Sequence, residues 1–239
     1  MTEATTSTAE AHDHSHSDVS GGWLRAAVFG AMDGLVTNTA LVAGVGGGGA
    51  PPRAIVLAGV ASLVAGAISM SLGEYTSVKT QNEQLDLEVE QERRELERNP
   101  AGELAELTRM LRVRGVDDRL AERVAIQLSK DPEAALRLHA VAELGLNPDD
   151  KPSPRVAAVS SFLTFGTGAL LPLLPYLFGV TVLWPALLFG GAGLLVAGAL
   201  SSRFTARPWW YSGLRQLIFG AVAAGITYAI GAAIGVGVS

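Results

Sequence analysis

The chain has 239 residues, of which 49% are hydrophobic, and a formal net charge of −5 at pH 7. It contains no cysteine, which excludes disulfides, thiolate metal sites and cysteine redox chemistry. Charge is segregated, because residues 81–150 hold 17 acids against 10 bases, a net of −7, and residues 151–239 hold no acid. This pattern predicts a membrane protein with one acidic soluble domain.

Residues 1–20 are rich in Thr, Ser and Ala and have few large apolar side chains, so we expect a disordered tail. The tail lacks the basic start and apolar run of a signal peptide. His12, His14 and His16 alternate along it. This spacing is compatible with weak binding of a transition metal, and a solvated tail without metal is the simpler interpretation.

Five apolar segments are long enough to cross the hydrocarbon core as helices, which takes about 20 residues each. Two lie in residues 21–80 and three in residues 151–239. The expected spans are 23–45, 54–75, 156–178, 181–202 and 214–236. No helix breaker follows the second span, so we expect one long helix to leave the membrane and enter the acidic domain.

Residues 81–150 are predicted to form a domain of three to four helices. Leu104, Leu107 and Leu111 make an apolar stripe at helical spacing, and Pro100 and Gly115 mark helix ends. Strand signals are absent from the sequence pattern. The predicted fold class is therefore all-α, a five-span transmembrane bundle with a helical domain inserted between spans two and three.

The distribution of basic residues predicts the orientation in the membrane. By the positive-inside rule, the amino terminus and the acidic domain are expected in the cytoplasm and the carboxyl terminus outside, with only Arg53 against this assignment. The bases on the expected cytoplasmic side are Arg25, Lys79, Lys151, Arg155, Arg203, Arg207 and Arg215.

The first span carries Asp33 near its middle, where a carboxylate costs several kcal/mol and marks an ion or proton pathway. Thr37 shares its helix face. The second span has a stripe of small or polar residues that includes Ser62 and Met70, and Glu74 lies one turn beyond Met70. These five residues are the candidates for a transport path.

If the Asp33 face of the first span meets the polar stripe of the second span, the two together combine carboxylate oxygens, hydroxyls and a thioether. The thioether shifts the preference from Mg²⁺ or Ca²⁺ toward softer first-row divalent ions. A buried carboxylate can also trade a proton for a cation. The alternative is that Asp33 caps a helix break or pairs with a base, and that Met70 only packs.

The acidic domain contains pairs of glutamates at i, i+3 spacing, and pairs on facing helices can build carboxylate metal sites. His139 precedes Glu143 by four residues, so both can face one site. The Glu-x-x-His motif of di-iron proteins is absent. Charged helix faces are usually only solvated, which is the alternative. The candidate ligands are Glu92, Glu95, Glu103, Glu106, Glu143 and His139.

Several motifs, in this order, resemble the vacuolar iron transporter family over roughly residues 22–238. They are residues 33–44 (DGLVTNTALVAG), 65–75 (AGAISMSLGEY), 131–133 (DPE), 143–146 (ELGL) and 171–176 (LPLLPY). The resemblance implies a homodimer that exports Fe²⁺ or Mn²⁺ from the cytoplasm in exchange for protons, for metal homeostasis and detoxification. It also implies that Asp33 and Met70 line the path and that the cytoplasmic glutamates collect metal.

Two positions depart from the family pattern. Ser62 stands where plant members carry a glutamate, which bears on proton coupling, and His139 and Ala140 stand where they carry paired methionines. The second change removes sulfur ligands and favours Mn²⁺. The metal is expected as the substrate, also bound in the soluble domain, with no prosthetic group. The other expected partners are protons, the lipid bilayer and a second copy of the chain, and no nucleic acid.

Two other classes of function are alternatives to transport. A membrane-anchored metal sensor or storage adaptor would bind metal without moving it, although such an anchor has no need of Asp33. An enzyme is not expected, because a nucleophile elbow, a His-Glu-x-x-His motif and a phosphate-binding loop are absent from the sequence. The Ala-, Gly-, Val- and Arg-rich composition suggests a bacterial plasma membrane, with a vacuolar membrane as the alternative.

Overall fold

The computed structural model describes residues 22–145, 150–204 and 207–238, and every regular element within these ranges is a helix. The predicted histidine-containing tail lies outside them. The elements are α1 (Gly22–Gly47), α2 (Pro52–Arg98), α3 (Pro100–Val113), α4 (Asp118–Leu128), α5 (Pro132–His139), the π-helix η1 (Ala140–Leu144), α6 (Pro154–Leu170), the 3₁₀-helix η2 (Leu171–Leu173), α7 (Leu174–Leu177), α8 (Leu183–Ser201), the 3₁₀-helix η3 (Ser202–Phe204) and α9 (Trp209–Val238). The all-α class is thus confirmed.

Five helical segments are long and apolar enough to cross a membrane, as predicted: Trp23–Gly47, Pro52–Arg98, Pro154–Leu177, Leu183–Ser201 and Trp209–Gly235. The third bends at Pro172 and Pro175 into η2 and α7. The fifth begins five residues earlier than predicted. There the Pro208 carbonyl accepts hydrogen bonds from the amides of Tyr211 and Ser212, so the aromatic segment joins the helix.

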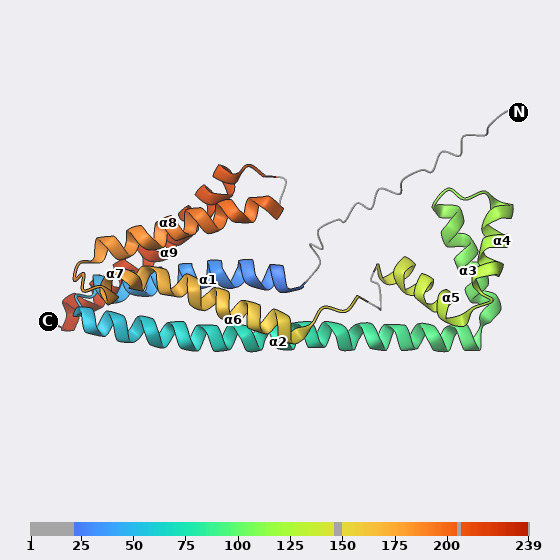
Figure 1. The fold of residues 1–239 in the computed structure, drawn as a ribbon, viewed down its shortest axis with the longest axis horizontal. Helices are drawn as coiled ribbons and strands as arrows, with labels where there is room; N and C mark the ends of the chain where they lie inside the picture. The colour runs from blue at the N-terminus through green and yellow to red at the C-terminus, as the bar shows by residue number, and fades with distance from the viewer. Residues whose placement is uncertain (1–21, 146–149, 205–206, 239) are drawn as a thin grey trace, which may run out of the picture.

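Helix α1 occupies the centre of the apolar bundle and contacts α2, α6, α8 and α9 (Figure 1). Glycines allow this close packing. A Cβ on Gly34 would collide with the Phe165 carbonyl of α6, and one on Gly231 of α9 would collide with the Gly44 carbonyl of α1. Small residues at such contacts are typical of membrane bundles. The helix that carries Asp33 is therefore held on several sides by backbone-to-backbone contacts.

A fully buried asparagine joins three of these helices. The Asn38 side-chain amide on α1 donates to the Gly59 carbonyl of α2 at 3.2 Å and to the Ala169 carbonyl of α6 at 2.6 Å. Both acceptors are main-chain atoms of other helices, so the contact fixes the depth of α1 against its neighbours. Interhelical hydrogen bonds of this kind contribute on average about 0.6 kcal/mol in a membrane protein.

Replacing Asn38 by alanine is expected to destabilise the bundle by about 1 kcal/mol, from two lost interhelical bonds. In a chain of this length this lowers the melting temperature by about 2–4 °C. Thermal unfolding of the detergent-solubilised protein measures it. Thr167→Ala is the matched control, because the Thr167 hydroxyl bonds only within its own helix, to Leu163. Equal melting of wild type and Asn38→Ala would show that Asn38 is not a structural link.

Helix α2 extends far beyond the apolar bundle, as the sequence predicts. Its 47 residues reach about 70 Å at about 1.5 Å per residue, more than twice a hydrocarbon core of about 30 Å. The polar half carries α3, α4 and α5 at the end remote from the bundle (Figure 1). Asp117 and Asp131 cap α4 and α5 by accepting backbone amide hydrogen bonds.

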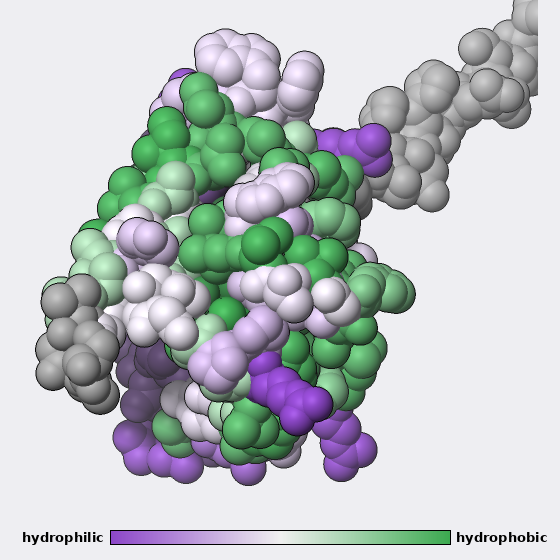
Figure 2. Space-filling view, turned by 90° about the vertical axis from the view of Figure 1, so that its left-hand side faces the viewer, coloured by the Kyte–Doolittle hydropathy of each residue, from purple (hydrophilic) through white to green (hydrophobic). Residues whose placement is uncertain are grey.

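The chain returns from these helices to the bundle along α2. The Asn82 side-chain amide donates to the Pro152 carbonyl at 3.0 Å, and Lys151 forms an ion pair with Asp86. Seen from the end of the molecule remote from α3 and α4, the surface is mostly apolar or intermediate in hydropathy, with few hydrophilic patches (Figure 2). The surface at this end of the bundle is therefore largely without charged groups.

Candidate metal sites

A buried histidine and three carboxylates converge where α2 and α3 meet the junction of α5 and η1. His139 is 1% exposed. Its Nδ1 atom lies 2.9 Å from Glu92 Oε1, 3.7 Å from Glu103 Oε2 and 3.5 Å from Glu143 Oε1. Glu92, Glu103 and His139 offer ligand atoms that all lie within 4.8 Å of one another. Residues from three parts of the chain thus form one candidate cation site.

Local structure explains how each ligand reaches this point. Asn99 caps α3 by accepting from the Gly102 amide, which puts Glu103 in the first turn of α3. Helix α5 ends at His139 and passes directly into the π-helix that carries Glu143. Single π-turns are rare and often occur at functional sites. Arg114 donates to the Ala142 carbonyl at 3.2 Å and so supports this turn from the end of α3.

Two of the buried atoms have no hydrogen-bond partner. Glu92 Oε1 and His139 Nδ1 are close, yet neither forms a hydrogen bond with the residues that the structure describes. Buried polar atoms without a hydrogen bond cost free energy, and a shared cation would remove this cost. Next to them lies a polar cavity of about 130 Å³, larger than the ~30 Å³ that one water occupies. Its lining residues are Glu88, Gln91, Glu92, Glu95, Ala140 and Glu143.

The electrostatics of the cluster favour cation binding. Burial, followed by the charges of Glu143, Glu103, Glu95 and Glu106, raises the pKa of Glu92 from 4.5 to about 7. Burial also raises the pKa of Glu103, against an opposing effect of His139. Crowded carboxylates that resist ionisation are stabilised by a divalent cation.

The predicted ligands therefore divide into two groups. Glu92, Glu103, Glu143 and His139 meet at one point, and Glu95 lines the adjoining cavity. Glu106 instead pairs with Arg109 at 2.7 Å and adds only its charge. Sequence reasoning missed Glu88 and Gln91. Glu88 could have been found one turn before Glu92 on the same helix face.

The second candidate site lies on α1 within the apolar bundle. The Thr37 hydroxyl donates to Asp33 Oδ1 at 3.3 Å, as their spacing suggests. Asp33 is exposed on the protomer, and no ion pair involves it among the residues that the structure describes. An uncovered carboxylate at this depth is costly in a bilayer.

The candidates on α2 occupy different surroundings. Glu74 pairs with Arg25 at 3.1 Å, and its side chain is 13% exposed. Met70 packs against a buried cluster of Ala67, Phe165 and Ala169. Ser62 is half-buried.

The two helices can nevertheless be aligned in depth. The Arg25–Glu74 and Asn38–Gly59 contacts show that α1 and α2 run antiparallel. Asp33 lies eight residues after Arg25, so its level on α2 is near Gly66, eight residues before Glu74. Ser62 and Met70 each lie one turn from that level. Asp33 therefore lies at a depth between Ser62 and Met70, which are separated by about 12 Å along α2.

Comparison with known proteins identifies relatives over nearly the whole chain. The VIT family profile matches residues 24–232. The chain belongs to the VIT family. It is 37% identical over 215 residues to a vacuolar iron transporter of Acanthamoeba castellanii, covering 88% of this chain and 78% of the relative. It is 33% identical over 236 residues to vacuolar iron transporter 1 of Oryza sativa subsp. japonica, covering 95% and 92%.

Membership of the VIT family confirms the resemblance read from the motifs. A further relative, vacuolar iron transporter 1 of Tulipa gesneriana, is 34% identical over 221 residues, covering 88% of this chain and 87% of the relative. Family membership and five apolar helices together support a membrane protein. Both candidate sites lie within the matched range.

Metal binding by this VIT-family protein is expected to depend on pH through Glu92. Because the pKa of Glu92 is about 7, a cation must displace a proton at lower pH, and affinity should fall by up to about tenfold per pH unit below 7. The metal-free protein should respond differently. Its folded state holds this proton more tightly than the unfolded chain, so stability should fall as pH rises from 4.5 to about 7.

Titration with Mn²⁺ at pH 5.5, 6.5 and 7.5 measures the affinity, and denaturant unfolding of the metal-free protein measures the stability. Glu92→Gln should flatten both profiles, because it removes the titrating group. Glu90→Gln is the matched control, since Glu90 is exposed on the same helix and pairs with Arg94. Wild-type affinity that does not change across this range would contradict the assignment of Glu92.

Proposed function

We propose that this protein transports a divalent transition metal, Fe²⁺ or Mn²⁺ or both, out of the cytoplasm in exchange for protons. The observation that carries the proposal is the buried cluster of Glu92, Glu103 and His139, in which Glu92 belongs to the helix that continues into the membrane. The relatives are named vacuolar iron transporters, which supports metal transport and indicates a transporter rather than an enzyme. Metal homeostasis and detoxification are the corresponding roles.

The first step is capture of the cation by the helices at the polar end of α2, which we assign to the cytoplasm. Carboxylate oxygens and one imidazole bind borderline first-row ions, and the site has no sulfur ligand to favour softer ones. The surrounding acids, Glu88 and Glu95 among them, raise the local concentration of cations. Loading releases the proton of Glu92.

The second step is passage through the membrane at the layer of Asp33. The Asp33 carboxylate and the Thr37 hydroxyl provide hard oxygen ligands, and Met70 adds selectivity if its thioether turns from the Phe165 cluster toward the path. Ser62 contributes a hydroxyl about one helical turn from this level. A carboxylate in a low-dielectric layer holds either a cation or a proton, which is the basis for exchange.

Proton exchange is assigned to Asp33 rather than to Glu74. The Arg25 guanidinium already compensates the charge of Glu74 at 3.1 Å, whereas no base faces Asp33 among the described residues. We therefore assign Glu74 to the rim of the path, where its pair with Arg25 links α1 to α2.

The transporting unit is proposed to be a homodimer. Asp33 is exposed on the isolated protomer, and lipid does not compensate an ionised carboxylate. On α2, Ala61, Ala65, Ser69 and Gly73 are exposed at i, i+4 spacing, a pattern that lets helices approach closely. A second copy related by a two-fold axis would cover both features.

A metal sensor or storage adaptor is the second candidate, and the distance between the two sites favours it. Glu92 lies 26 residues along α2 from the level of Asp33 at Gly66, about 39 Å at about 1.5 Å per residue. A cation bound at the cluster is therefore far from the bundle, and the cluster could act alone.

Transport into proteoliposomes separates the two functions. The reconstituted full chain is offered Fe²⁺, Mn²⁺, Zn²⁺ and Co²⁺ singly and in competition, with and without a pH gradient. The proposal predicts uptake of Fe²⁺ or Mn²⁺ that a proton gradient in the opposite direction accelerates. Stoichiometric binding of Mn²⁺ without uptake of any of the four ions would favour the sensor and reject transport. Immunolocalisation distinguishes a plasma membrane from a vacuolar one.

A further inference from the structure

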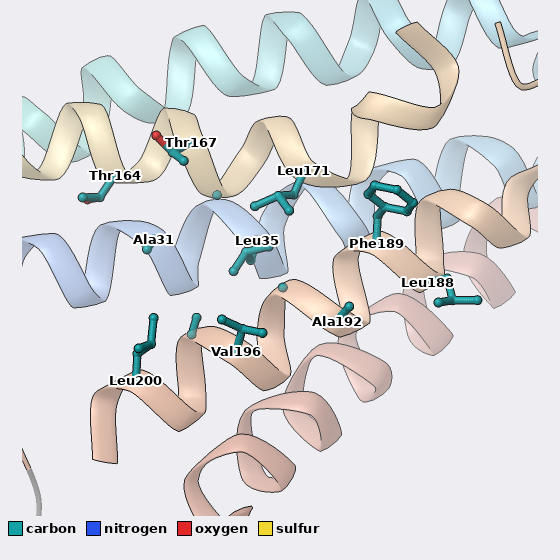
Figure 3. Close-up of a pocket in the computed structure, with 13 residues that line it drawn as sticks. Ala31, Leu35, Thr164, Thr167, Leu171, Leu188, Phe189, Ala192, Val196 and Leu200 are labelled. Carbon is teal, nitrogen blue, oxygen red and sulfur yellow. The ribbon is translucent and has the colours of Figure 1, made fainter. Parts of the chain in front are cut away.

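A second feature of the bundle is an apolar groove of about 560 Å³ between α8 and the pair of α1 and α6 (Figure 3). Leu35 of α1 and Leu171 of η2 face Ala192 and Val196 of α8 across it. Thr164 and Thr167 also line it, but each hydroxyl donates to a carbonyl of its own helix, that of Ser160 and that of Leu163. The described side chains of the groove thus offer no free polar group, so its occupant must be apolar.

The groove results from the way α8 leaves the centre of the bundle. A Cβ on Gly190 would collide with Thr39, and one on Gly193 would collide with Leu35, so α8 touches α1 closely there. Toward Leu200, α8 and α9 diverge from α1 and α6 (Figure 1). The wedge between them widens toward the end of the bundle from which the polar half of α2 extends.

The length of the groove matches one lipid chain. Its lining runs from Leu188 to Leu200 on α8, which is about 18 Å at about 1.5 Å per residue. One leaflet of a hydrocarbon core is about 15 Å thick, half of about 30 Å. A single acyl chain that enters at Leu200 would fill the groove along its length.

The mouth of the groove carries unneutralised positive charge. Arg203 follows Leu200 by three residues, Arg207 belongs to the same connection between α8 and α9, and Arg215 lies near the start of α9. All three are exposed, no acid occurs between residues 151 and 239, and none of them forms an ion pair within the described chain. The exposed Trp209 and Trp210 are typical of the headgroup level. An anionic phosphate is the complement of this surface.

We propose that the groove binds one acyl chain of an anionic phospholipid, whose phosphate is held by Arg203 with support from Arg207 and Arg215. The bound chain lies against Leu35, two residues from Asp33 on the same helix. It therefore fixes the spacing between α1 and the α8–α9 pair. The proposal rests on the membrane character of the chain and is independent of which ion it transports.

Native mass spectrometry of the full chain in mild detergent tests this site. The probes are phosphatidylglycerol and phosphatidylcholine with identical palmitoyl and oleoyl chains. Wild type should retain one phosphatidylglycerol per protomer, and Arg203→Gln should weaken this binding about fivefold, the effect of one basic residue on an anionic lipid. Ala192→Phe should reduce retention of both lipids, because the exposed Ala192 lines the groove.

Two control variants isolate the groove and its arginine. Arg53→Gln removes a base from the opposite side of the bundle, and Ala221→Phe adds a ring in a separate groove; neither should change retention. If Ala192→Phe does not fold, Thr167→Phe fills the groove from its opposite wall. Equal retention of the two lipids by wild type, or full retention by the filled variants, would overturn the proposal. The proposal would also be overturned if filling the groove changed only the proportion of dimer. That result would show that a second copy of the chain, and not a lipid, covers the groove.

Discussion

Replacing Asp33 by asparagine is expected to abolish metal transport. The substitution keeps the shape of the side chain and its contact with Thr37 but removes the charge that would compensate a cation in the bundle. An uncompensated charge at this depth costs several kcal/mol, and each 1.4 kcal/mol is a factor of ten. Uptake of Mn²⁺ or Fe²⁺ into proteoliposomes should therefore fall at least about a hundredfold, while metal binding at the His139 cluster stays intact.

The matched control for this loss is Asp131→Asn. Asp131 is exposed and caps α5, and asparagine caps helices about as well as aspartate, so transport should not change. Asp33→Glu should retain partial transport, since it keeps the charge and lengthens the side chain. Transport by Asp33→Asn at the wild-type rate would remove Asp33 from the path.

The second large effect is expected at the buried cluster. Replacing His139 by leucine should lower Mn²⁺ affinity at least tenfold, because the loss of even an outer-shell partner costs about 10- to 100-fold. Glu92→Gln should lower the affinity similarly. Unlike a structural defect, however, it should raise the melting temperature of the metal-free protein, since it removes a crowded buried carboxylate.

Isothermal titration of the full-length protein with Mn²⁺ measures the affinity, and thermal unfolding without metal gives the second readout. Glu106→Gln is the graded comparison, since Glu106 pairs with Arg109 and influences the cluster only through its charge. Its effect should be smaller than that of Glu92→Gln. If Glu92→Gln lowers both affinity and melting temperature, Glu92 supports the fold and is not a ligand.

The sequence was sufficient for the parts of the fold that depend on local pattern. Apolar length predicted five spanning helices, and the absence of a breaker after residue 75 predicted that α2 continues beyond the membrane. The boundary of α9 was wrong by five residues, because the aromatic segment after Pro208 is compatible with both an interfacial loop and a helix.

The sites depend on tertiary contacts, which spacing predicts only in part. Helical spacing placed His139 and Glu143 on one face, but it contained no sign of the π-helix between them or of Glu88 at the cavity. The pair of Arg25 and Glu74 joins residues 49 positions apart, so the environment of Glu74 was not accessible from its neighbours. Likewise, only the packed bundle reveals that Asp33 is exposed on the protomer.

The central claim is that a divalent metal crosses the membrane in exchange for protons at Asp33. Its most direct test follows metal entry and internal pH together in proteoliposomes that contain a metal-sensitive dye and a pH-sensitive dye. The prediction is that Mn²⁺ or Fe²⁺ enters wild-type vesicles, the interior becomes more alkaline as protons leave, and both signals disappear with Asp33→Asn. Metal entry without any pH change, or both signals at full size with Asp33→Asn, would contradict it.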